Sequence, residues 1–323
     1  MTRHYLVTGG AGFIGSNFIR HLLEQEPGAR VTNLDLLTYA GVKATVDELD
    51  RYDAHDFAHG DIRDPELVDA LVPGHDVIVN FAAESHVDRS IEGPSVFLET
   101  NIVGTGILLE AARRHEVPRF LQVSTDEVYG SIDEGFAPED ARLRPSSPYS
   151  ASKAGADLLV HSYAVTYDYP AIVTRCTNNY GPYQFPEKVI PLFITNLLDD
   201  RSVPLYGDGR NERDWLHVED HCSAIRLLVD AGEPGDTYNI GADAQLSNLD
   251  LTHKLLDLLG RDASFIDRVP DRPGHDLRYA VDSSKLRTLG WAPEHGLDDR
   301  LAETVEWYRS REDWWRPLKG DKP

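Results

Sequence analysis

The sequence predicts an α/β protein with a doubly wound parallel sheet and a smaller, mixed C-terminal lobe. Two observations carry this prediction. Short apolar runs alternate with helical patterns through the first half of the chain, which is typical of a parallel sheet covered by helices on both faces. A glycine-rich segment, residues 8–15, stands at the first change from strand to helix. The length of 323 residues fits one large domain with an appended lobe.

The expected elements follow in order along the chain. The strands are residues 4–8, 30–35, 76–82, 119–125 and 171–178, and the helices among them are residues 13–23, 101–115 and 149–167. The doubly wound core therefore covers residues 1–180. Residues 181–323 are mixed, with loop chemistry at 180–187, a strand at 203–206 and helices at 219–231 and 248–259. We expect them to form predominantly a substrate-binding lobe, with some segments returning to the core. Near the end, Leu301, Val305 and Tyr308 recur at helical spacing, and we expect Trp314 and Trp315 to cover the core.

Composition and charge exclude several classes of protein. A net charge of -22 would repel nucleic acid and anionic lipid, which are bound through clustered Lys and Arg. The first residues enter a strand pattern without a basic leader, and we expect no apolar run long enough to span a bilayer, so the prediction is a cytoplasmic protein. Cys176 and Cys222 lie far apart without partners at metal-ligand spacing, which predicts two buried fillers and neither a disulfide nor a metal site.

The glycine-rich segment predicts a site for a dinucleotide cofactor. Gly9 permits a tight turn, Gly12 lets a pyrophosphate approach the backbone, and Gly15 lets the helix pack closely on the strand. The helix that begins with Phe13 and Ile14 presents its amide donors and its favourable dipole to the same phosphates. This pattern is typical of a Rossmann fold, and we expect these residues to contact the cofactor.

A carboxylate ends the second expected strand. Asp35 follows the last glycine by about 20 residues, where an acidic side chain binds the adenosine ribose. It would also repel a 2′-phosphate, and Lys43 is too far along the chain to compensate, so the prediction is NAD rather than NADP. After the next strand, Asp61 and Ile62 are expected near the adenine, whereas Asp64 is equally well explained as the N-cap of the following helix.

Tyr149 and Lys153 stand four residues apart at the start of an expected helix, so they project from one face. A nearby ammonium favours the phenolate. The pair therefore predicts a lowered pKa for Tyr149, which would act as a base toward a sugar hydroxyl while nicotinamide takes the hydride.

With these residues in place, the chain resembles the extended short-chain dehydrogenase/reductase family, and within it the dTDP-glucose 4,6-dehydratases. The segment Val123–Gly130, VSTDEVYG, looks like their signature, and residues 35–41, 82–88 and 272–276 match as well. The resemblance covers nearly the whole chain. It implies an NAD-dependent lyase that oxidises dTDP-glucose at C4, eliminates water across C5 and C6, and returns the hydride to C6.

The resemblance also implies catalytic roles. Removing water across C5 and C6 of a 4-keto sugar needs a base for the C5 proton and an acid for the C6 hydroxide, and adjacent carboxyl groups divide these tasks only if one stays protonated. By resemblance, Glu127 is the base, Asp126 is the acid, and Thr125 binds the C4 oxygen beside Tyr149. The alternative for these residues is a polar strand end with a capped turn.

Substrate contacts are implied in the same way. Ser85 resembles a family residue near the sugar, and Asn179 would donate to the pyrophosphate. Other expected contacts are Lys188, Arg213, Arg272 and His275 for the nucleotide diphosphate, and Glu187 and Asn248 for the base or ribose. An acidic protein needs such local basic groups to hold a diphosphate. Taken singly, each of these residues is also compatible with a solvated or capping role.

Two other functions stay open. A 4-epimerase or a decarboxylase would share the cofactor site and the Tyr–Lys pair, but neither needs an acid for the C6 hydroxyl, so Asp126 beside Glu127 is the discriminating feature. A catalytically silent NAD-sensing protein would have no reason to keep these side chains together. The resemblance further implies a homodimer, in which helices 101–115 and 149–167 form a four-helix bundle with a second copy.

Overall fold

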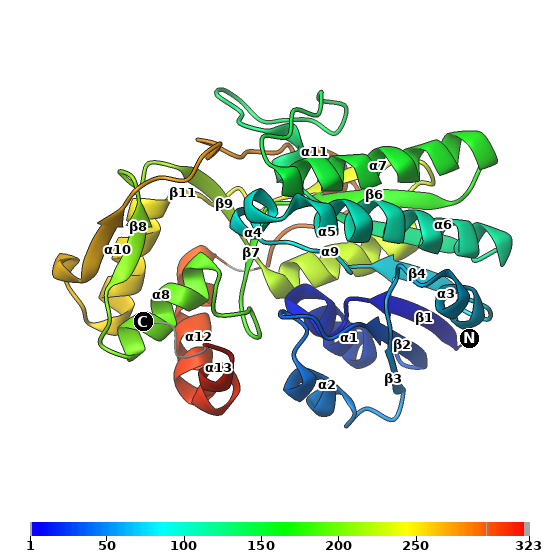
Figure 1. The fold of residues 1–323 in the computed structure, drawn as a ribbon, viewed down its shortest axis with the longest axis horizontal. Coiled ribbons are helices and arrows are strands. Elements are labelled where there is room, and N and C mark those ends of the chain that lie inside the picture. The colour runs from blue at the N-terminus through cyan, green and yellow to red at the C-terminus, as the bar shows by residue number, and fades with distance from the viewer. Residues whose placement is uncertain (1, 295, 320–323) are drawn as a thin grey trace.

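A seven-stranded parallel sheet lies at the centre of the computed structural model, which describes residues 2–294 and 296–319 (Figure 1). The strand order is β3-β2-β1-β4-β5-β6-β10, and all neighbouring pairs run parallel. The chain moves outward from β1 in one direction and from β4 in the other, so the order reverses between these two strands. The predicted doubly wound fold is confirmed, and this reversal is where such folds hold ligands, at the carboxyl ends of the strands.

Helices cover both faces of this sheet. Its strands are β1 (Arg3–Thr8), β2 (Ala29–Asp35), β3 (His55–His59), β4 (Val77–Asn80), β5 (Arg119–Thr125), β6 (Ala171–Cys176) and β10 (Thr237–Ile240). One face carries α1 (Phe13–Gln25), α2 (Lys43–Leu49) and α9 (Val218–Ala231), and the other carries α3 (Pro65–Leu71), α6 (Thr105–Arg114) and α7 (Pro148–Tyr167) (Figure 1). Because both faces are covered, β4, β5 and β6 are almost entirely buried.

Local sequence determines where two of these helices begin. The Ser147 side chain accepts from the N–H of Ser150, whose hydroxyl in turn accepts from the N–H of Ser147, and Pro148 occupies the first helical position of α7. Asp64 accepts from two backbone N–H groups at the start of α3, which confirms the capping interpretation of this residue.

The helix expected over residues 101–115 begins earlier than predicted. It starts as α5 (Pro94–Leu98), continues through a π-helical segment, η1 (Glu99–Gly104), and becomes α6. Pro94 at the first helical position sets the start. Gly104 is needed for close packing, because a Cβ there would lie 2.7 Å from Cδ1 of Ile62.

The strand expected over residues 171–178 is two strands in two sheets. β6 ends at Cys176, and β7 (Asn178–Tyr180) pairs with β9 (Glu212–His217) in the C-terminal lobe. The chain therefore passes between the two lobes at Thr177, whose N–H still bonds to Ile240 of the central sheet.

The C-terminal lobe has its own small sheets and core. A three-stranded sheet has the order β11-β9-β7, with β11 (Gln245–Ser247), and β8 (Val203–Tyr206) pairs with β12 (Ile266–Val269). The helices of this lobe are α8 (Val189–Leu198), α10 (Asn248–Leu259), α12 (Leu297–Ser310) and α13 (Glu312–Lys319). Tyr308, Trp314 and Trp315 are buried among them, as the sequence predicts. The remaining short helices are α4 (Val87–Glu92), η2 (Asp126–Tyr129), η3 (Ala263–Phe265) and α11 (Ser284–Thr288).

One helical stretch, residues 94–114, is long and apolar enough to cross a membrane by length and composition, contrary to the sequence-based expectation. The most apolar window of this stretch is 44% buried inside the molecule, and α5 and α6 pack against α7. A helix in a protein core passes the same test, so length and composition alone are weak evidence for a membrane span.

Candidate active site

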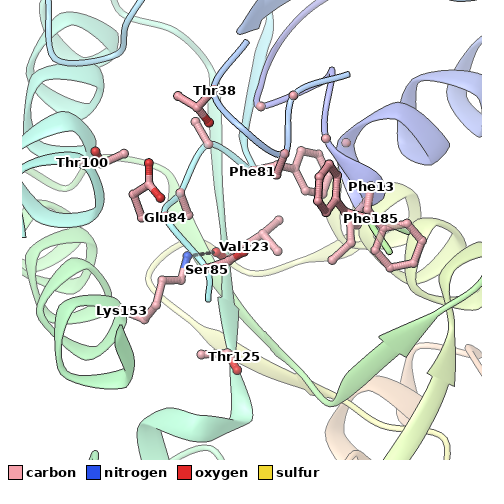
Figure 2. A pocket seen from close by; sticks show the side chains of 18 of the residues that line it. Phe13, Thr38, Phe81, Glu84, Ser85, Thr100, Val123, Thr125, Lys153 and Phe185 are labelled. Atoms are coloured by element: carbon pink, nitrogen blue, oxygen red, sulfur yellow. Dashed lines mark hydrogen bonds between the residues drawn. The ribbon is translucent and has the colours of Figure 1, made fainter. Parts of the chain in front are cut away.

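A cleft of about 320 Å³ opens at the carboxyl ends of the central strands. Its walls bring together the glycine-rich loop, the ends of β2 and β3, the loop after β4, the turn η2, the start of α7 and residues 176–188. Figure 2 shows the rings of Phe13, Phe81 and Phe185 gathered on one side, with Lys153 on the opposite side. One apolar wall therefore faces one polar wall across the cleft.

The glycine-rich loop is packed so closely that side chains are excluded. Gly9 has φ +72°, and a Cβ on it would lie 2.6 Å from the backbone nitrogen of Ala82. A Cβ on Gly15 would lie 2.4 Å from the carbonyl oxygen of Gly9. Gly12 is the N-cap of α1, and no side chain caps this helix. The N–H groups of the first turn remain available to an anion, as a pyrophosphate requires.

Asp35 is held against this loop by two backbone hydrogen bonds. Its Oδ2 accepts from the N–H of Ala11 (3.0 Å) and its Oδ1 from the N–H of Leu37 (2.8 Å). Burial raises the pKa of this carboxyl, and the two hydrogen bonds oppose that rise. Each oxygen of a carboxylate has more than one acceptor position, so Asp35 keeps the capacity to bind two ribose hydroxyls.

Asp61 and Ile62 also line the cleft, at the end of β3. The Asp61 carboxylate accepts from the Arg63 guanidinium (2.7 Å) and from the N–H of the same residue (2.8 Å). Burial opposes ionisation of Asp61, but these bonds outweigh it and lower its pKa. Ile62 is buried beneath the helix at Gly104. The structure therefore places both residues on the cleft, beside the glycine-rich loop.

Tyr149 and Lys153 both line the cleft from the first turns of α7. The Lys153 ammonium donates to the carbonyl oxygen of Val123 (2.7 Å) (Figure 2), and burial lowers its pKa. The pKa of Tyr149 lies well above its ordinary value because the phenol is buried and Glu127 lies nearby. The predicted lowering by Lys153 is wrong for this structure, because burial dominates the pKa of Tyr149 and the contact that opposes it is a hydrogen bond with Thr125.

Asp126 and Glu127 face the same cleft from η2, directly after β5. The Thr125 hydroxyl accepts from the N–H of Glu127 (3.3 Å) and donates to Oδ1 of Asp126 (3.2 Å). Oδ2 of Asp126 is buried and has no hydrogen-bond partner among the described residues. The turn thus holds one buried carboxyl oxygen without a protein partner, in a residue that lines the cleft.

The two carboxyl groups differ in their electrostatic surroundings. Burial and the neighbouring Glu127 raise the pKa of Asp126 well above its ordinary value, opposed by Arg213. Burial also raises the pKa of Glu127, but Arg272, Lys188 and Arg213 all oppose that rise. Three cations act on Glu127, and one acts on Asp126. This difference favours a protonated Asp126 beside an ionised Glu127.

The structure brings part of the expected substrate set into the cleft. Ser85, Asn179, Glu187 and Lys188 line it, whereas Arg213, Arg272, His275 and Asn248 are outside the residues that form its wall. Arg213 and Arg272 nevertheless oppose the rise in the pKa of Glu127. The pKa of His275 is lowered mainly by burial, and Arg272 and Arg213 lower it further. Asn248 begins α10, and its N–H bonds to the carbonyl oxygen of Asn211. Its contact with the base or ribose of a nucleotide remains a prediction.

Most of these polar groups are already oriented by protein contacts. The Lys188 ammonium donates to the carbonyl oxygen of Ser85 (3.1 Å), and a guanidinium nitrogen of Arg89 lies 3.4 Å from Oε2 of Glu187. Both contacts join the C-terminal lobe to the loop and helix that follow β4. They fix the position of these residues before a substrate binds.

Several cleft residues were missed by the sequence reasoning. Phe81 and Glu84 line the wall after β4, and Thr100, Gln184 and Phe185 line other parts of it. Phe81 and Glu84 follow the carboxyl end of β4, and residues at the carboxyl ends of central strands commonly contact ligands in this fold, so their position in the sequence could have predicted them. Gln184 and Phe185 come from the other lobe, so nothing local in the sequence marks them.

The two cysteines are free and buried, as predicted. Cys176 lies on the wall of the cleft, and burial raises its pKa to about 12, so the thiol stays protonated. Within residues 2–294 and 296–319, no cluster of three or more His, Cys, Asp or Glu side chains is placed to hold a metal ion.

Comparison with known proteins identifies the family. The model of the GDP-mannose 4,6 dehydratase family matches residues 6–304. A dTDP-glucose 4,6-dehydratase from Streptomyces niveus is 51% identical over 319 residues, covering 97% of this chain and 95% of the relative. This chain belongs to the dTDP-glucose 4,6-dehydratase family.

Solved structures agree with this assignment. The dTDP-glucose 4,6-dehydratase DesIV from Streptomyces venezuelae, solved with NAD and TYD bound, is 53% identical and covers 98% of this chain and 99% of its own, with a TM-score of 0.96. The UDP-glucose 4-epimerase from Thermus thermophilus in complex with NAD has a TM-score of 0.87 at 31% identity, covering 95% of this chain and 99% of its own. The dehydratases and this epimerase share the fold, but the dehydratase is closer in sequence.

The raised pKa of Asp126 predicts a pH-dependent stability effect in Asp126→Asn. When folding raises the pKa of a carboxyl group, the contribution of that group to stability is fully present at pH values below its pKa in the unfolded chain. The contribution is lost as the pH rises through the pKa of the folded state. The asparagine cannot ionise, so the variant should gain unfolding free energy over the parent, on the order of 1–3 kcal/mol at pH 8 and little at pH 4. Urea denaturation at several pH values measures this difference.

The exposed Asp133→Asn is the control for the substitution itself. A gain in Asp126→Asn that is equally large at acidic and alkaline pH would contradict a raised pKa at this position.

Proposed function

We propose that this chain converts dTDP-glucose to dTDP-4-keto-6-deoxyglucose, with Thr125, Asp126, Glu127, Tyr149 and Lys153 as its catalytic residues. The observation that carries this proposal is the pair of adjacent carboxyl groups in unequal surroundings, facing the cleft beside Tyr149. A 4-epimerase has no need for such a pair. Sequence identity of 51% to a dTDP-glucose 4,6-dehydratase over nearly the whole chain supports the same substrate.

The cofactor is NAD, held by the glycine-rich loop, Asp35, Asp61 and Ile62. The loop excludes side chains where a pyrophosphate must approach, and the first turn of α1 keeps its N–H groups available. Asp35 has the acceptor capacity for two ribose hydroxyls and would repel a 2′-phosphate. When bound, NAD supplies the hydride acceptor for C4 and the hydride donor for C6.

Tyr149 takes the proton from the C4 hydroxyl, and Thr125 orients the C4 oxygen. The buried phenol has a raised pKa in the structure, so it needs added positive charge before it can act as a base. Lys153 lies on the same helix face, but it is already present in the structure in which the pKa of Tyr149 is raised. Oxidised nicotinamide would bring a further positive charge, so binding of the cofactor favours the ionised phenol.

Asp126 donates a proton to the departing C6 hydroxide, and Glu127 removes the C5 proton. The unpaired Oδ2 of Asp126 is the atom that would carry the donated proton. Burial raises the pKa of Glu127, but Arg272, Lys188 and Arg213 oppose that rise and so favour its ionised form. These unequal surroundings favour, in each carboxyl group, the protonation state that its role requires.

The substrate diphosphate is held by Lys188, Arg213, Arg272 and His275, with Asn179 donating to the pyrophosphate. Of these residues, Lys188, Arg213 and Arg272 place their positive charges around Glu127, in a protein whose net charge is -22. Glu187 and Asn248 contact the base or ribose, and Ser85 contacts the sugar. The two expected lobes, divided at about residue 180, then close on the nucleotide sugar from opposite sides.

Deuterium placed at C4 of the substrate should appear at C6 of the product, because one hydride leaves C4 and returns within the same active site. The measurement is mass spectrometry and NMR of product from purified protein incubated with labelled dTDP-glucose and no added reductant. A mixed incubation with unlabelled substrate is the control for release of intermediates. Steady accumulation of reduced nicotinamide, with the C6 hydroxyl still on the product, would exclude a dehydratase.

The two carboxyl groups should be separable by substitution. Asp126→Asn should slow water loss by about 100-fold while C5 protons still exchange with solvent, since it lacks only the proton donor. Glu127→Gln should suppress C5 exchange itself by a similar factor of about 100. Both are measured by deuterium incorporation from D₂O. A reversed exchange pattern would require the acid and base assignments to be swapped.

We further propose that the protein is a cytoplasmic homodimer assembled through a four-helix bundle. The helical stretch 94–114 and α7 pack side by side (Figure 1) and carry exposed apolar side chains. These side chains include Val103 (54%), Leu158 (61%) and Val165 (71%). In a two-fold dimer, the surface that carries them in one copy would pack against the same surface of the second copy, and the two helices from each copy would form the bundle. NAD and nucleotide sugars are cytoplasmic metabolites, which supports the location.

The double variant Val103→Glu/Leu158→Glu should therefore be monomeric, because four charges would meet in the buried core of the bundle. Light scattering after gel filtration measures the molar mass. The parent chain should elute at twice the chain mass. Leu258→Glu, a partly exposed position on α10, is the control and should not change the mass. A monomeric parent chain would rule out the proposed assembly.

A further inference from the structure

The turn η2, which carries Asp126 and Glu127, is too short to hold its own position. It has four residues and lies between the end of β5 and Gly130. Short 3-10 helices have few and poorly aligned hydrogen bonds. The Thr125 cap is one contact that holds it, and the bond from the N–H of Arg144 to the carbonyl oxygen of Val128 is another. Neither contact connects the turn to α7, and the direct packing between the two is apolar, between Val128 and Tyr129 of the turn and Ala154 of the helix.

Tyr129, the last residue of the turn, provides such a connection. Its side chain is buried, and its hydroxyl accepts from Nη1 of Arg175 at 2.7 Å. Nε of the same guanidinium donates to Oδ2 of Asp157 at 2.9 Å. Asp157 lies one helical turn after Lys153 on α7, and it favours the charged form of that lysine. A continuous chain of buried polar contacts therefore joins η2 to α7 through β6.

The outer end of this chain is also fixed. The Tyr129 hydroxyl donates to Oδ1 of Asn239 on β10 (2.8 Å), and the Asn239 amide donates to the carbonyl oxygens of Ala137 (2.9 Å) and Asp282 (3.1 Å). Tyr129 is thus held by one donor and one acceptor, which leaves its hydroxyl a single orientation. Arg175 and Asp157 are 6% and 2% exposed, so the ion pair is shielded from solvent.

We infer that Tyr129 is a positioning residue, which with Arg175 and Asp157 holds the elimination pair Asp126 and Glu127 at a fixed place relative to the redox pair Tyr149 and Lys153. This inference rests on the proposed function. Oxidation at C4 and water loss across C5 and C6 occur on adjacent carbons of one sugar, so two side-chain pairs on different elements must serve one bound substrate. A brace between these elements meets that requirement, because small displacements of a catalytic group slow a reaction strongly.

The experiment uses Tyr129→Phe, which keeps the ring and the Arg175–Asp157 ion pair and removes only the hydroxyl. In a single turnover with dTDP-glucose, the absorbance of reduced nicotinamide reports oxidation, and quenched samples report water loss by mass. We expect oxidation within about twofold of the parent and water loss slowed about tenfold, with the oxidised sugar accumulating. Arg175→Lys, which keeps the charge but loses the guanidinium geometry, should show the same selective effect.

Tyr238→Phe is the matched control, because Tyr238 is also a buried tyrosine whose hydroxyl accepts a hydrogen bond, here from the backbone N–H of Glu233 (2.9 Å), and it lies on β10, away from η2. It should leave the ratio of the two rates unchanged. Urea denaturation of all variants measures the stability change separately. If Tyr129→Phe slowed both steps equally, or behaved like Tyr238→Phe, the positioning role would be overturned. If the parent chain lost no water from dTDP-glucose, the proposed function itself would fail and the inference with it.

Discussion

The burial of ionisable groups at the carboxyl edge of the sheet is the constraint on which the rest of this structure depends. Asp126, Glu127, Tyr149 and Lys153 all have pKa values displaced toward the neutral form, and burial is the largest cause in each case. Taking such groups out of water costs free energy, which the two apolar cores on the faces of the sheet offset. The same burial favours the protonated form of the Asp126 carboxyl group, and elimination of a poor leaving group needs such an acid.

Charge in this protein is organised at two scales. The net charge of -22 acts over the whole surface, but it is screened within about 10 Å at ordinary ionic strength. Lys188, Arg213 and Arg272 act locally, inside the reach of Glu127. A diphosphate that enters the site therefore experiences these nearby cations more strongly than the distant surface carboxylates. The cations that would bind the substrate are also those that favour ionisation of Glu127, so binding and catalysis share one set of charges.

Features that depend on local sequence were predicted well. The strand at residues 119–125 and the helix at 248–259 have the predicted bounds, and the glycine-rich loop and the Tyr149–Lys153 pair lie on the cleft as expected. Features that depend on tertiary packing were not. The division of residues 171–178 between two sheets follows from the second lobe, and the raised pKa of Tyr149 follows from burial that spacing on a helix does not reveal. Gln184 and Phe185 reach the cleft only because the lobes meet there.

The last strand of the central sheet has a consequence for how the chain is made. β10 pairs with β6, yet β6 ends at Cys176 and β10 begins at Thr237, after β7, α8, β8 and β9 of the second lobe (Figure 1). Ribosomes extend a chain by roughly 5–20 residues each second, so β6 lacks this neighbour for several seconds during synthesis. Throughout that interval its open edge can pair with another nascent chain. The central sheet therefore cannot be completed during synthesis until the first part of the second lobe has also been made.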